Sequence, residues 1–174
     1  MTRAIRPTGV EDFLGEEELI VSKTDLKGRI TYANDVFLRV SKFKQSELIG
    51  APHSLIRHPD MPRCVFKLLW DTLQSRQEIF AYVVNLAKDG SHYWVFAHVT
   101  PTFDNDHKII SFHSNRRVPD PKVIKTAIAP LYAEVLREES MHRNGKDALA
   151  AGYRRLIDFV ASQKVSYDEL IFAL

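Results

Sequence analysis

Residues 79–102, IFAYVVNLAKDGSHYWVFAHVTPT, hold two apolar runs on either side of a short polar segment. Aromatic and β-branched side chains dominate residues 79–86 and 92–102, as is typical of central strands in an antiparallel sheet. Lys88-Asp89-Gly90 lies between the two runs and supplies turn residues. The stretch therefore predicts two central strands joined by a turn.

Three more strand candidates lie on either side of this stretch. Residues 19–24 and 29–32 show a β-type pattern around the turn residues Asp25-Leu26-Lys27-Gly28, which predicts a hairpin with a four-residue connection. Residues 108–117 follow the polar turn 104–106 and form the fifth candidate.

Helical segments separate the first two strands from the last three. Asn34-Asp35 offers a cap ahead of an apolar helical face in residues 36–40, and a short helix is expected at 46–48. Residues 63–74 are too densely apolar for a half-exposed helix, so this helix should cover a sheet. Because strands and helices are segregated along the chain, the pattern predicts an α+β domain with helices on one face of a five-stranded antiparallel sheet.

The composition changes at Val118-Pro119-Asp120-Pro121. Asp120 should cap a helix that runs to Glu139 with a kink at Pro130. A second amphipathic helix is expected at 147–163, followed by an apolar tail at 170–174. We therefore divide the chain into a mobile or loosely docked lead-in (1–17), a main domain (18–118) and a C-terminal helical extension (119–174).

The composition excludes several classes of protein. The 174 residues are 45% hydrophobic and 26% charged, and the formal net charge of +2 is too slight to argue for nucleic acid or a membrane surface as a partner. No apolar run approaches the roughly 20 residues that span a bilayer, and the N-terminus lacks a secretory signal. The single cysteine, Cys64, can form no intramolecular disulfide. We expect a cytoplasmic protein without direct membrane insertion.

Residues 56–62, IRHPDMP, place a cation, an imidazole and a carboxylate close together and bracket the carboxylate with prolines. One interpretation is a stiff helix start, with Asp60 as the cap and Pro62 at the first helical position. Capping leaves Arg57 and His58 unexplained, so the second interpretation is a polar binding site.

Residues 17–117 resemble a PAS domain and, within that fold, the sensory domain of Aer-type aerotaxis and energy-taxis receptors. The hairpin and helix in residues 24–37 are similar to those of many PAS domains, whereas Arg57 to Pro62 and His92 to Val95 are specific to the Aer-like group. Pro130-Leu131-Tyr132 is similar to the segment that follows the PAS core in these receptors. The other matching residues are Glu47-Leu48-Ile49-Gly50, Pro52-His53, Phe66, Trp70, Asn85 and Lys88-Asp89-Gly90.

The resemblance implies a PAS fold that binds FAD non-covalently and senses redox state. By position, the residues that would line the flavin pocket between the helices and the sheet are Asn34, Arg57, His58, Asp60, Trp70 and Asn85. Aer-type receptors continue into a membrane anchor and a signalling coiled coil, and the 174 residues given contain neither segment. The chain is more similar to bipartite energy-taxis systems, in which a separate PAS flavoprotein signals to a membrane chemoreceptor or its cytoplasmic signalling domain. We expect such a partner, and a homodimer formed through the PAS domain or the C-terminal helices.

Each site residue also has an ordinary structural interpretation. Arg57 could fork onto a phosphate or carbonyl oxygen or pair with Asp60, and Trp70 could stack on a flavin or pack in the core. His58 is either a cofactor ligand or a satisfied polar residue, and Asn34 is either a ligand or a helix cap. Asn85 interrupts an apolar strand; because an amide both donates and accepts, it could answer the change of flavin N5 from acceptor to donor on reduction.

Rival functions can be weighed from the same residues. Haem needs an axial ligand, and several histidines are present without a pattern that selects one, so a haem-binding gas sensor is the second candidate. A cofactor-free PAS dimerisation or interaction module is the third. A flavin–cysteine photoadduct is disfavoured because Cys64 lies outside the helix that carries such a cysteine. We expect no enzymatic activity, since the chain has neither a nucleophile elbow nor a phosphate loop.

Overall fold

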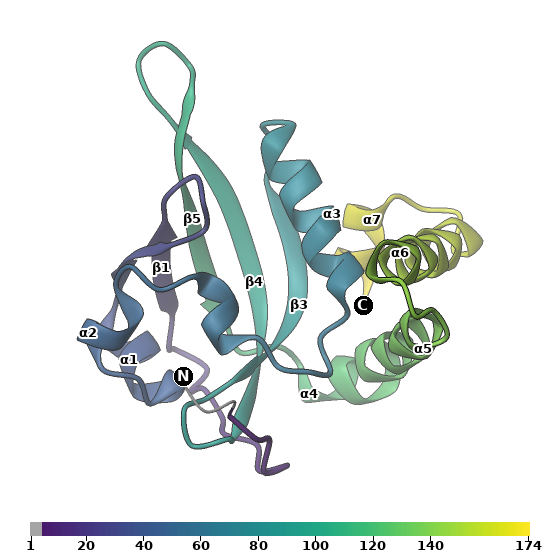
Figure 1. Ribbon diagram of the computed structural model, residues 1–174, viewed down its shortest axis with the longest axis horizontal. Coiled ribbons are helices and arrows are strands. Elements are labelled where there is room, and N and C mark those ends of the chain that lie inside the picture. Colours follow the sequence, from purple (N-terminus) through teal and green to yellow (C-terminus); the bar gives the residue numbers. More distant parts are fainter. Residues whose placement is uncertain (1–4) are drawn as a thin grey trace.

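A five-stranded antiparallel sheet with the order β2-β1-β5-β4-β3 is the frame of the computed structural model, which describes residues 5–174 (Figure 1). The predicted α+β fold is confirmed, and the hairpin between the first two strands has a connection of residues 25–29, one residue longer than predicted. The strands are β1 (Ile20–Thr24), β2 (Ile30–Ala33), β3 (Ile79–Leu86), β4 (His92–Phe103) and β5 (Ile109–Arg117).

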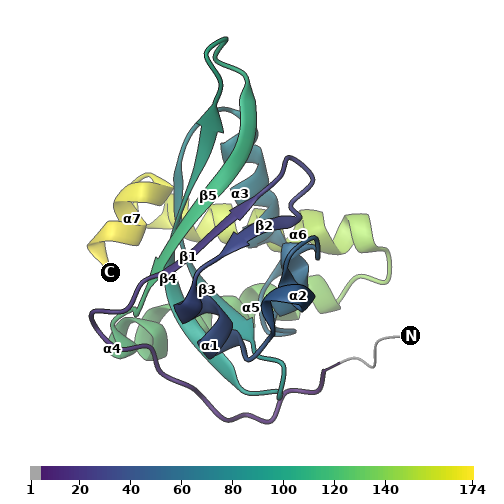
Figure 2. The same ribbon diagram turned by 90° about the vertical axis from the view of Figure 1, so that its left-hand side faces the viewer.

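The predicted central position of both strands in residues 79–102 is wrong for β3. The middle strand is β5, and β3 lies at the edge of the sheet. Its residues are nevertheless almost all buried, because C-terminal helices pack along this edge (Figures 1 and 2). The hydroxyl of Tyr132 donates a 2.6 Å hydrogen bond to the carbonyl oxygen of Tyr82 there. The apolar composition of β3 therefore indicates that the strand is buried, but it does not indicate that a strand lies on each side of it.

The four helices between β2 and β3 lie on one face of the sheet and enclose the core with it (Figure 1). They are α1 (Asp35–Ser41), α2 (Gln45–Leu48), the short 3₁₀ helix η1 (His53–Ile56) and α3 (Arg63–Gln74). Asn34 caps α1, which is one of the two roles predicted for it, because its side chain accepts a hydrogen bond from the N–H of Phe37. Phe37, Ile56 and Leu73 are fully buried and belong to the same core cluster as Ile20 and Val95 of the sheet.

The start of α3 differs from the capping interpretation. Pro62 occupies the cap position without a side-chain hydrogen bond, and the Asp60 side chain is 79% exposed. A carboxylate from far along the chain is at the helix start instead: Glu139 accepts from the backbone N–H groups of Arg63 at 3.3 Å and Cys64 at 3.1 Å. The prediction of a local cap fails here because a residue distant in the sequence, Glu139, accepts from the N–H groups that such a cap would have bound.

The C-terminal extension consists of α4 (Pro121–Val123), the π-helical turn η2 (Ile124–Ile128), α5 (Ala129–Ser140), α6 (Gly145–Ser162) and α7 (Tyr167–Ala173). Asp120 caps its start as predicted. The helix widens just ahead of Pro130, where Ala129 donates to the carbonyl of Ile124, because proline has no N–H for the regular ladder. The predicted apolar tail is helix α7, whose start has a capping box formed by Ser166 and Glu169.

Residues 8–12 pair with the turn before β4, so this part of the expected lead-in is docked. Thr8 donates to the carbonyl of Gly90 at 2.8 Å, and His92 donates to that of Val10 at 2.9 Å. The Nζ of Lys42 lies 2.5 Å from Asp12 and 2.7 Å from Asp89. Residues 1–4 of the lead-in lie outside the described residues.

Among the helices of residues 5–174, none combines the length and the apolar character that crossing a membrane requires.

Candidate functional site

A cavity of about 100 Å³ lies between the sheet and the wall formed by η1 and α3. Its apolar lining comes from η1, α3, β3, β4 and β5. The residues that contribute are Ile56, Phe66, Leu69, Trp70, Leu73, Val83, Ala97, Val99 and Phe112. Polar groups complete the lining: Ser22, Thr24, His53, Ser54, Arg57, Asn85, His113, Ser114 and Arg116.

Arg57 lies at the mouth of this cavity, where η1 ends. Its backbone forms an isolated β-bridge with Asn85, and its guanidinium carbon lies 4.1 Å from the centre of the Phe66 ring. Burial and the nearby charge of Arg63 lower the pKa of Arg57, yet such a group stays cationic at neutral pH. The bridge and the ring contact hold one cation beside the opening.

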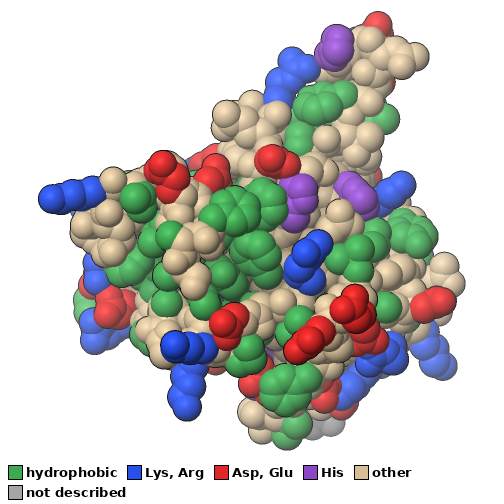
Figure 3. Space-filling model, turned by 180° about the vertical axis from the view of Figure 1, so that it is seen from behind, with side chains coloured by type: hydrophobic (Ala, Val, Ile, Leu, Met, Phe, Trp, Pro, Cys, Tyr) green, Lys and Arg blue, Asp and Glu red, His purple; other side chains and the backbone are tan. Residues whose placement is uncertain are grey.

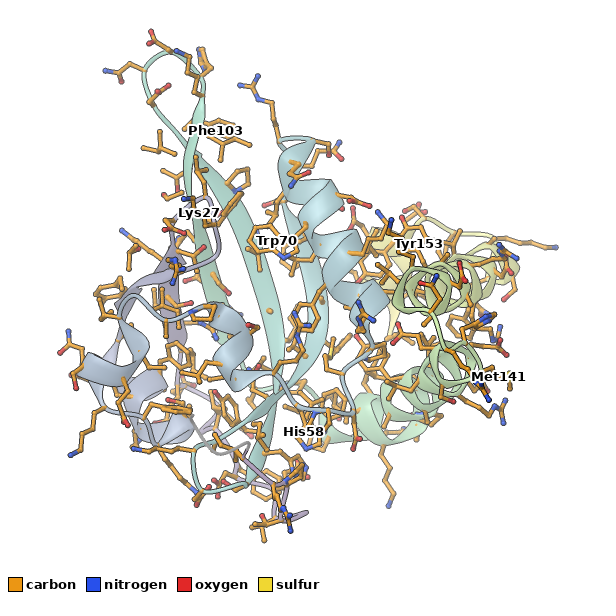
Figure 4. All side chains as sticks on the ribbon, viewed as in Figure 1. Lys27, His58, Trp70, Phe103, Met141 and Tyr153 are labelled. Carbon is orange, nitrogen blue, oxygen red and sulfur yellow. The ribbon has the colours of Figure 1, made fainter. Side chains whose placement is uncertain are left out.

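Trp70 projects from α3 into the space between the helix and the sheet (Figure 4). Its ring meets Phe112 of β5 edge-on, with 5.2 Å between ring centres. The turn between β1 and β2 closes over the same ring: a Cβ on Gly28 would lie 3.2 Å from it, and Gly28 has a φ of 74°. Trp70 is therefore a lining residue fixed from two sides.

Asn85 faces the cavity from the edge strand β3, opposite Tyr93 of β4. It is 3% exposed, and its side-chain nitrogen is buried without a hydrogen-bond partner among the described residues. Buried amides are nearly always paired. An unpaired donor at a cavity wall indicates a polar ligand.

Arg116, which the sequence reasoning missed, is the most deeply buried charge of the site. It is 2% exposed, donates to the hydroxyl of Ser22 and lies over the Phe37 ring at 4.6 Å. Its Nε and Nη1 have no partner in residues 5–174. Burial lowers its pKa to about 10, so it remains cationic at neutral pH. The alternation of Phe112, Ser114 and Arg116 along β5 was the available signal, since period-2 residues share one face of a strand.

Two further residues that were not singled out as site residues carry unpaired polar groups: His53, which lines the cavity, and Tyr93, which is not part of its lining. The Nε2 of His53 and the hydroxyl of Tyr93 are buried without partners within the described chain. Burial, followed by the charges of Arg116 and Arg57, lowers the pKa of His53 to about 3, which keeps its imidazole neutral. Burial raises the pKa of Tyr93, so the phenol stays protonated. Both groups can therefore donate or accept hydrogen bonds without a change of charge.

Asn34, His58 and Asp60 do not line the cavity. The side chain of Asn34 is committed to the backbone: its oxygen accepts from Val21 and Phe37, and its nitrogen donates to Leu19. His58 is buried at a distance from Trp70, and its Nδ1 accepts from the N–H of Asp60 at 3.1 Å (Figure 4). Of the six residues expected at a cofactor, the structure brings Arg57, Trp70 and Asn85 together.

A small internal cavity with unpaired polar groups, enclosed by short helices on one face of an antiparallel sheet, is the architecture of an α+β ligand-sensing domain. A model of the PAS fold matches residues 30–116, half of the 174-residue chain. The chain belongs to the PAS family.

Two curated relatives are sensory or regulatory proteins. The aerotaxis receptor of Escherichia coli (strain K12) is 40% identical over 120 residues, which are 68% of this chain and 23% of the receptor. The nitrogen fixation regulatory protein of Klebsiella pneumoniae is 30% identical over 51% of this chain and 18% of that protein. The chain thus spans about a quarter or less of the length of these relatives.

Solved structures with a similar fold include two light-oxygen-voltage domains. One, from a study of a flavin analogue, has a TM-score of 0.59 and 17% identity and covers 67% of this chain and 89% of that domain. The dark form of the Aureochrome1 domain has a TM-score of 0.57 and 18% identity and covers 66% and 86%, respectively. At these identities the likeness shows the fold alone.

Proposed function

We propose that this PAS domain binds FAD in the cavity beneath α3 and reports the redox state of the flavin to a chemoreceptor. The observation that carries the proposal is the set of buried polar atoms without partners around one cavity, on Asn85, His53 and Arg116. The relation to an aerotaxis receptor supports the sensory role. A flavin analogue was used to study the mechanism of one light-oxygen-voltage domain of the same fold.

The chemistry of the lining fits a flavin. The ring system needs apolar and aromatic walls, which Phe66, Leu69 and Trp70 offer, and its heteroatoms need hydrogen-bonding groups, which Asn85, His53 and Arg116 offer. Arg57 at the mouth suits the pyrophosphate. The bound flavin would supply reversible electron transfer.

The size of the cavity adds a requirement. A space of about 100 Å³ is below the ~300–1,000 Å³ typical of sites for such ligands. A cofactor of this size therefore has to displace the outer wall, which consists of α3 and η1. Movement of that wall is a direct way for binding, or a change in the bound group, to reach the rest of the protein.

Asn85 is our candidate for the switching residue. Its amide nitrogen has no partner in the described residues, so the side chain is free to present either a donor or an acceptor to the cofactor. The backbone of Asn85 also forms a β-bridge with Arg57, so a rotation of this amide could shift Arg57 at the cavity mouth.

The partner we propose is a membrane chemoreceptor or its cytoplasmic signalling domain, contacted by a homodimer of this chain in the cytoplasm. The uncovered part of the sheet and the C-terminal helices are the candidate contact surfaces. Figure 3 shows apolar side chains gathered on the back of the molecule, beside two histidines. Phe80 of β3, Phe96 of β4 and Phe172 of α7 form an aromatic cluster, because their rings pack on one another.

One spectrum tests the cofactor. We expect the purified protein to be yellow in air, to bleach with dithionite and to release FAD on heating. A Soret band would establish the haem alternative, and colourless protein that takes up no added flavin would leave the interaction module as the function.

A further inference from the structure

We infer that Glu139 of α5 is a positioning residue for the cavity: it fixes the start of α3 and links the cavity wall to helices α5 and α6. The inference concerns the C-terminal extension, to which the proposed flavin site gives no role, and its transmission step rests on that proposed function.

The contact is a substitute for the missing local cap of α3. Pro62 provides no capping side chain, and the Glu139 carboxylate accepts from the N–H groups of Arg63 and Cys64. A carboxylate also complements the positive end of the helix dipole. Glu139 is 8% exposed, so water competes weakly for these donors. Removing the carboxylate leaves the buried N–H of Cys64 and the partly buried N–H of Arg63 unpaired at the first turn of α3.

Helix α6 packs against the side chain of Glu139 at Gly152. A Cβ added to Gly152 would lie 2.5 Å from the Cγ of Glu139 and 2.7 Å from its Oε1, closer than such atoms can approach. Glycine at position 152 is therefore what allows α6 to pack on Glu139. The same helix reaches α3 directly, because the Nζ of Lys67 lies 5.4 Å from the centre of the Tyr153 ring.

Helix α3 connects this contact to the cavity. Phe66 and Trp70 of this helix line the cavity, about one and two turns beyond the capped N–H groups. The Arg57 guanidinium lies over the ring of Phe66. A rigid helix moves as a unit, so an outward shift of the wall displaces the capped end together with Glu139. Because Glu139 of α5 packs on Gly152 of α6, an outward shift of α3 must either move α5 and α6 with it or break the contact between Glu139 and the start of α3.

The first test needs no cofactor. In a Trp94→Phe background Trp70 is the single tryptophan of the chain. In FAD-free protein, Glu139→Gln should make the amides of Arg63 and Cys64 exchange about tenfold faster, since a lost cap opens the first turn. Acrylamide should quench Trp70 more strongly. Glu138→Gln, a neighbouring change without a capping contact, should alter neither value. Unchanged exchange and quenching in Glu139→Gln would overturn the inference.

A size exchange provides an independent test of the packing. Gly152→Ala should loosen α3 in the same two measurements, and Glu139→Ala should remove the clash. Gly152→Ala should therefore have a smaller effect on Trp70 quenching in the Glu139→Ala background than in wild type. Equal effects in the two backgrounds would show that Gly152 and Glu139 do not pack together, and the inference would fall.

The transmission step is tested with FAD as the probe. Hydrogen exchange in residues 129–162 should differ between FAD-loaded and FAD-free protein for wild type and Glu138→Gln, and the difference should shrink at least about threefold for Glu139→Gln. A full difference in Glu139→Gln would refute transmission through this residue. Wild-type protein that binds no FAD would refute the flavin function and the transmission step, while the cofactor-free measurements would still decide the positioning of α3.

Discussion

Arg116 donates a hydrogen bond to the hydroxyl of Ser22 across the paired strands β5 and β1, and its Nε and Nη1 have no partner within residues 5–174. A buried cation with unpaired donors is costly, by about 1–3 kcal/mol for each unsatisfied group. No carboxylate among the described residues forms a salt bridge with this guanidinium, whose observed contacts are the Ser22 hydroxyl and the Phe37 ring. The guanidinium is therefore better explained by a ligand than by stability.

The first prediction separates these two roles. In FAD-free protein, Arg116→Met should leave the free energy of unfolding unchanged or raise it by about 1–3 kcal/mol, because unpaired donors are removed from the interior. The same change should raise the Kd for FAD at least about tenfold, which is 1.4 kcal/mol. Urea denaturation and flavin fluorescence titration measure the two effects. The exposed neighbour variant Arg117→Met is the control, and a strong loss of stability in Arg116→Met would assign this residue to the fold.

The second prediction concerns the switch. Asn85→Ala should still bind FAD, because the remaining lining is intact, but reduction should no longer change the pattern of limited proteolysis. Wild type and Asn115→Ala, whose amide lies outside the cavity lining, should show different patterns in air and after dithionite. Asn85→Ala protein that retains the full wild-type difference would exclude the amide as the switch.

The third prediction is a pH dependence that arises from His53. Its pKa is about 3 in the folded protein and 6.5 in the unfolded chain, so the unfolded state binds more protons between these values. The free energy of unfolding should therefore fall as the pH is lowered from 6.5 towards 3, with a slope of up to about 1.4 kcal/mol per pH unit for one proton.

His53→Gln isolates that contribution. Burial also lowers the pKa values of His58 and His113, so part of the acid sensitivity should remain in the variant. Denaturation of FAD-free protein between pH 6.5 and 4 should give a shallower slope for His53→Gln than for wild type. Parallel curves would mean that His53 is protonated in the folded state, and its Nε2 would then not be a neutral group facing the cavity.

The elements of the fold were largely predictable from local patterns, and their arrangement was less so. The bounds of α3 and β3 agree with the prediction because caps, turn residues and apolar spacing are encoded within a few residues. The edge position of β3 was not predictable from its composition. A strand covered by helices of the same chain has the same apolar content as one that lies between two strands.

The site residues likewise fall into those that could be predicted from the sequence and those that could not. Arg57, Trp70 and Asn85 were expected at the flavin because they match positions of the Aer-type receptors, and local patterns alone also allowed ordinary structural roles for them. The alternation along β5 places Arg116 on one face of the strand, but only the pairing of β5 with β1 shows that this face points inward. Glu139 lies 75 residues from Cys64 along the chain, and no short-range rule connects the two. Conversely, Asn34, His58 and Asp60 were expected at the flavin because they match positions of the Aer-type receptors, whereas the structure places all three outside the cavity.

The fourth prediction tests how the C-terminal helices protect the sheet edge. The Tyr132 hydroxyl donates to the carbonyl of Tyr82, an edge-strand group that has no further strand to pair with. Tyr132→Phe keeps the ring and should lower the free energy of unfolding by about 0.5–1.5 kcal/mol, the usual net value of one hydrogen bond. Tyr153→Phe, whose hydroxyl has no hydrogen bond among the described residues, should change it less.

Tyr132→Ala should cost more, about 3–5 kcal/mol as for other buried aromatic residues, because the ring itself is 5% exposed. It should also uncover the edge of β3, and exposed edges pair with other chains. We therefore expect Tyr132→Ala to aggregate on warming at concentrations where Tyr132→Phe stays monodisperse in light scattering. If Tyr132→Phe loses no more stability than Tyr153→Phe, and Tyr132→Ala does not aggregate, then α5 does not seal this edge, and the burial of β3 depends on α3 and α7 instead.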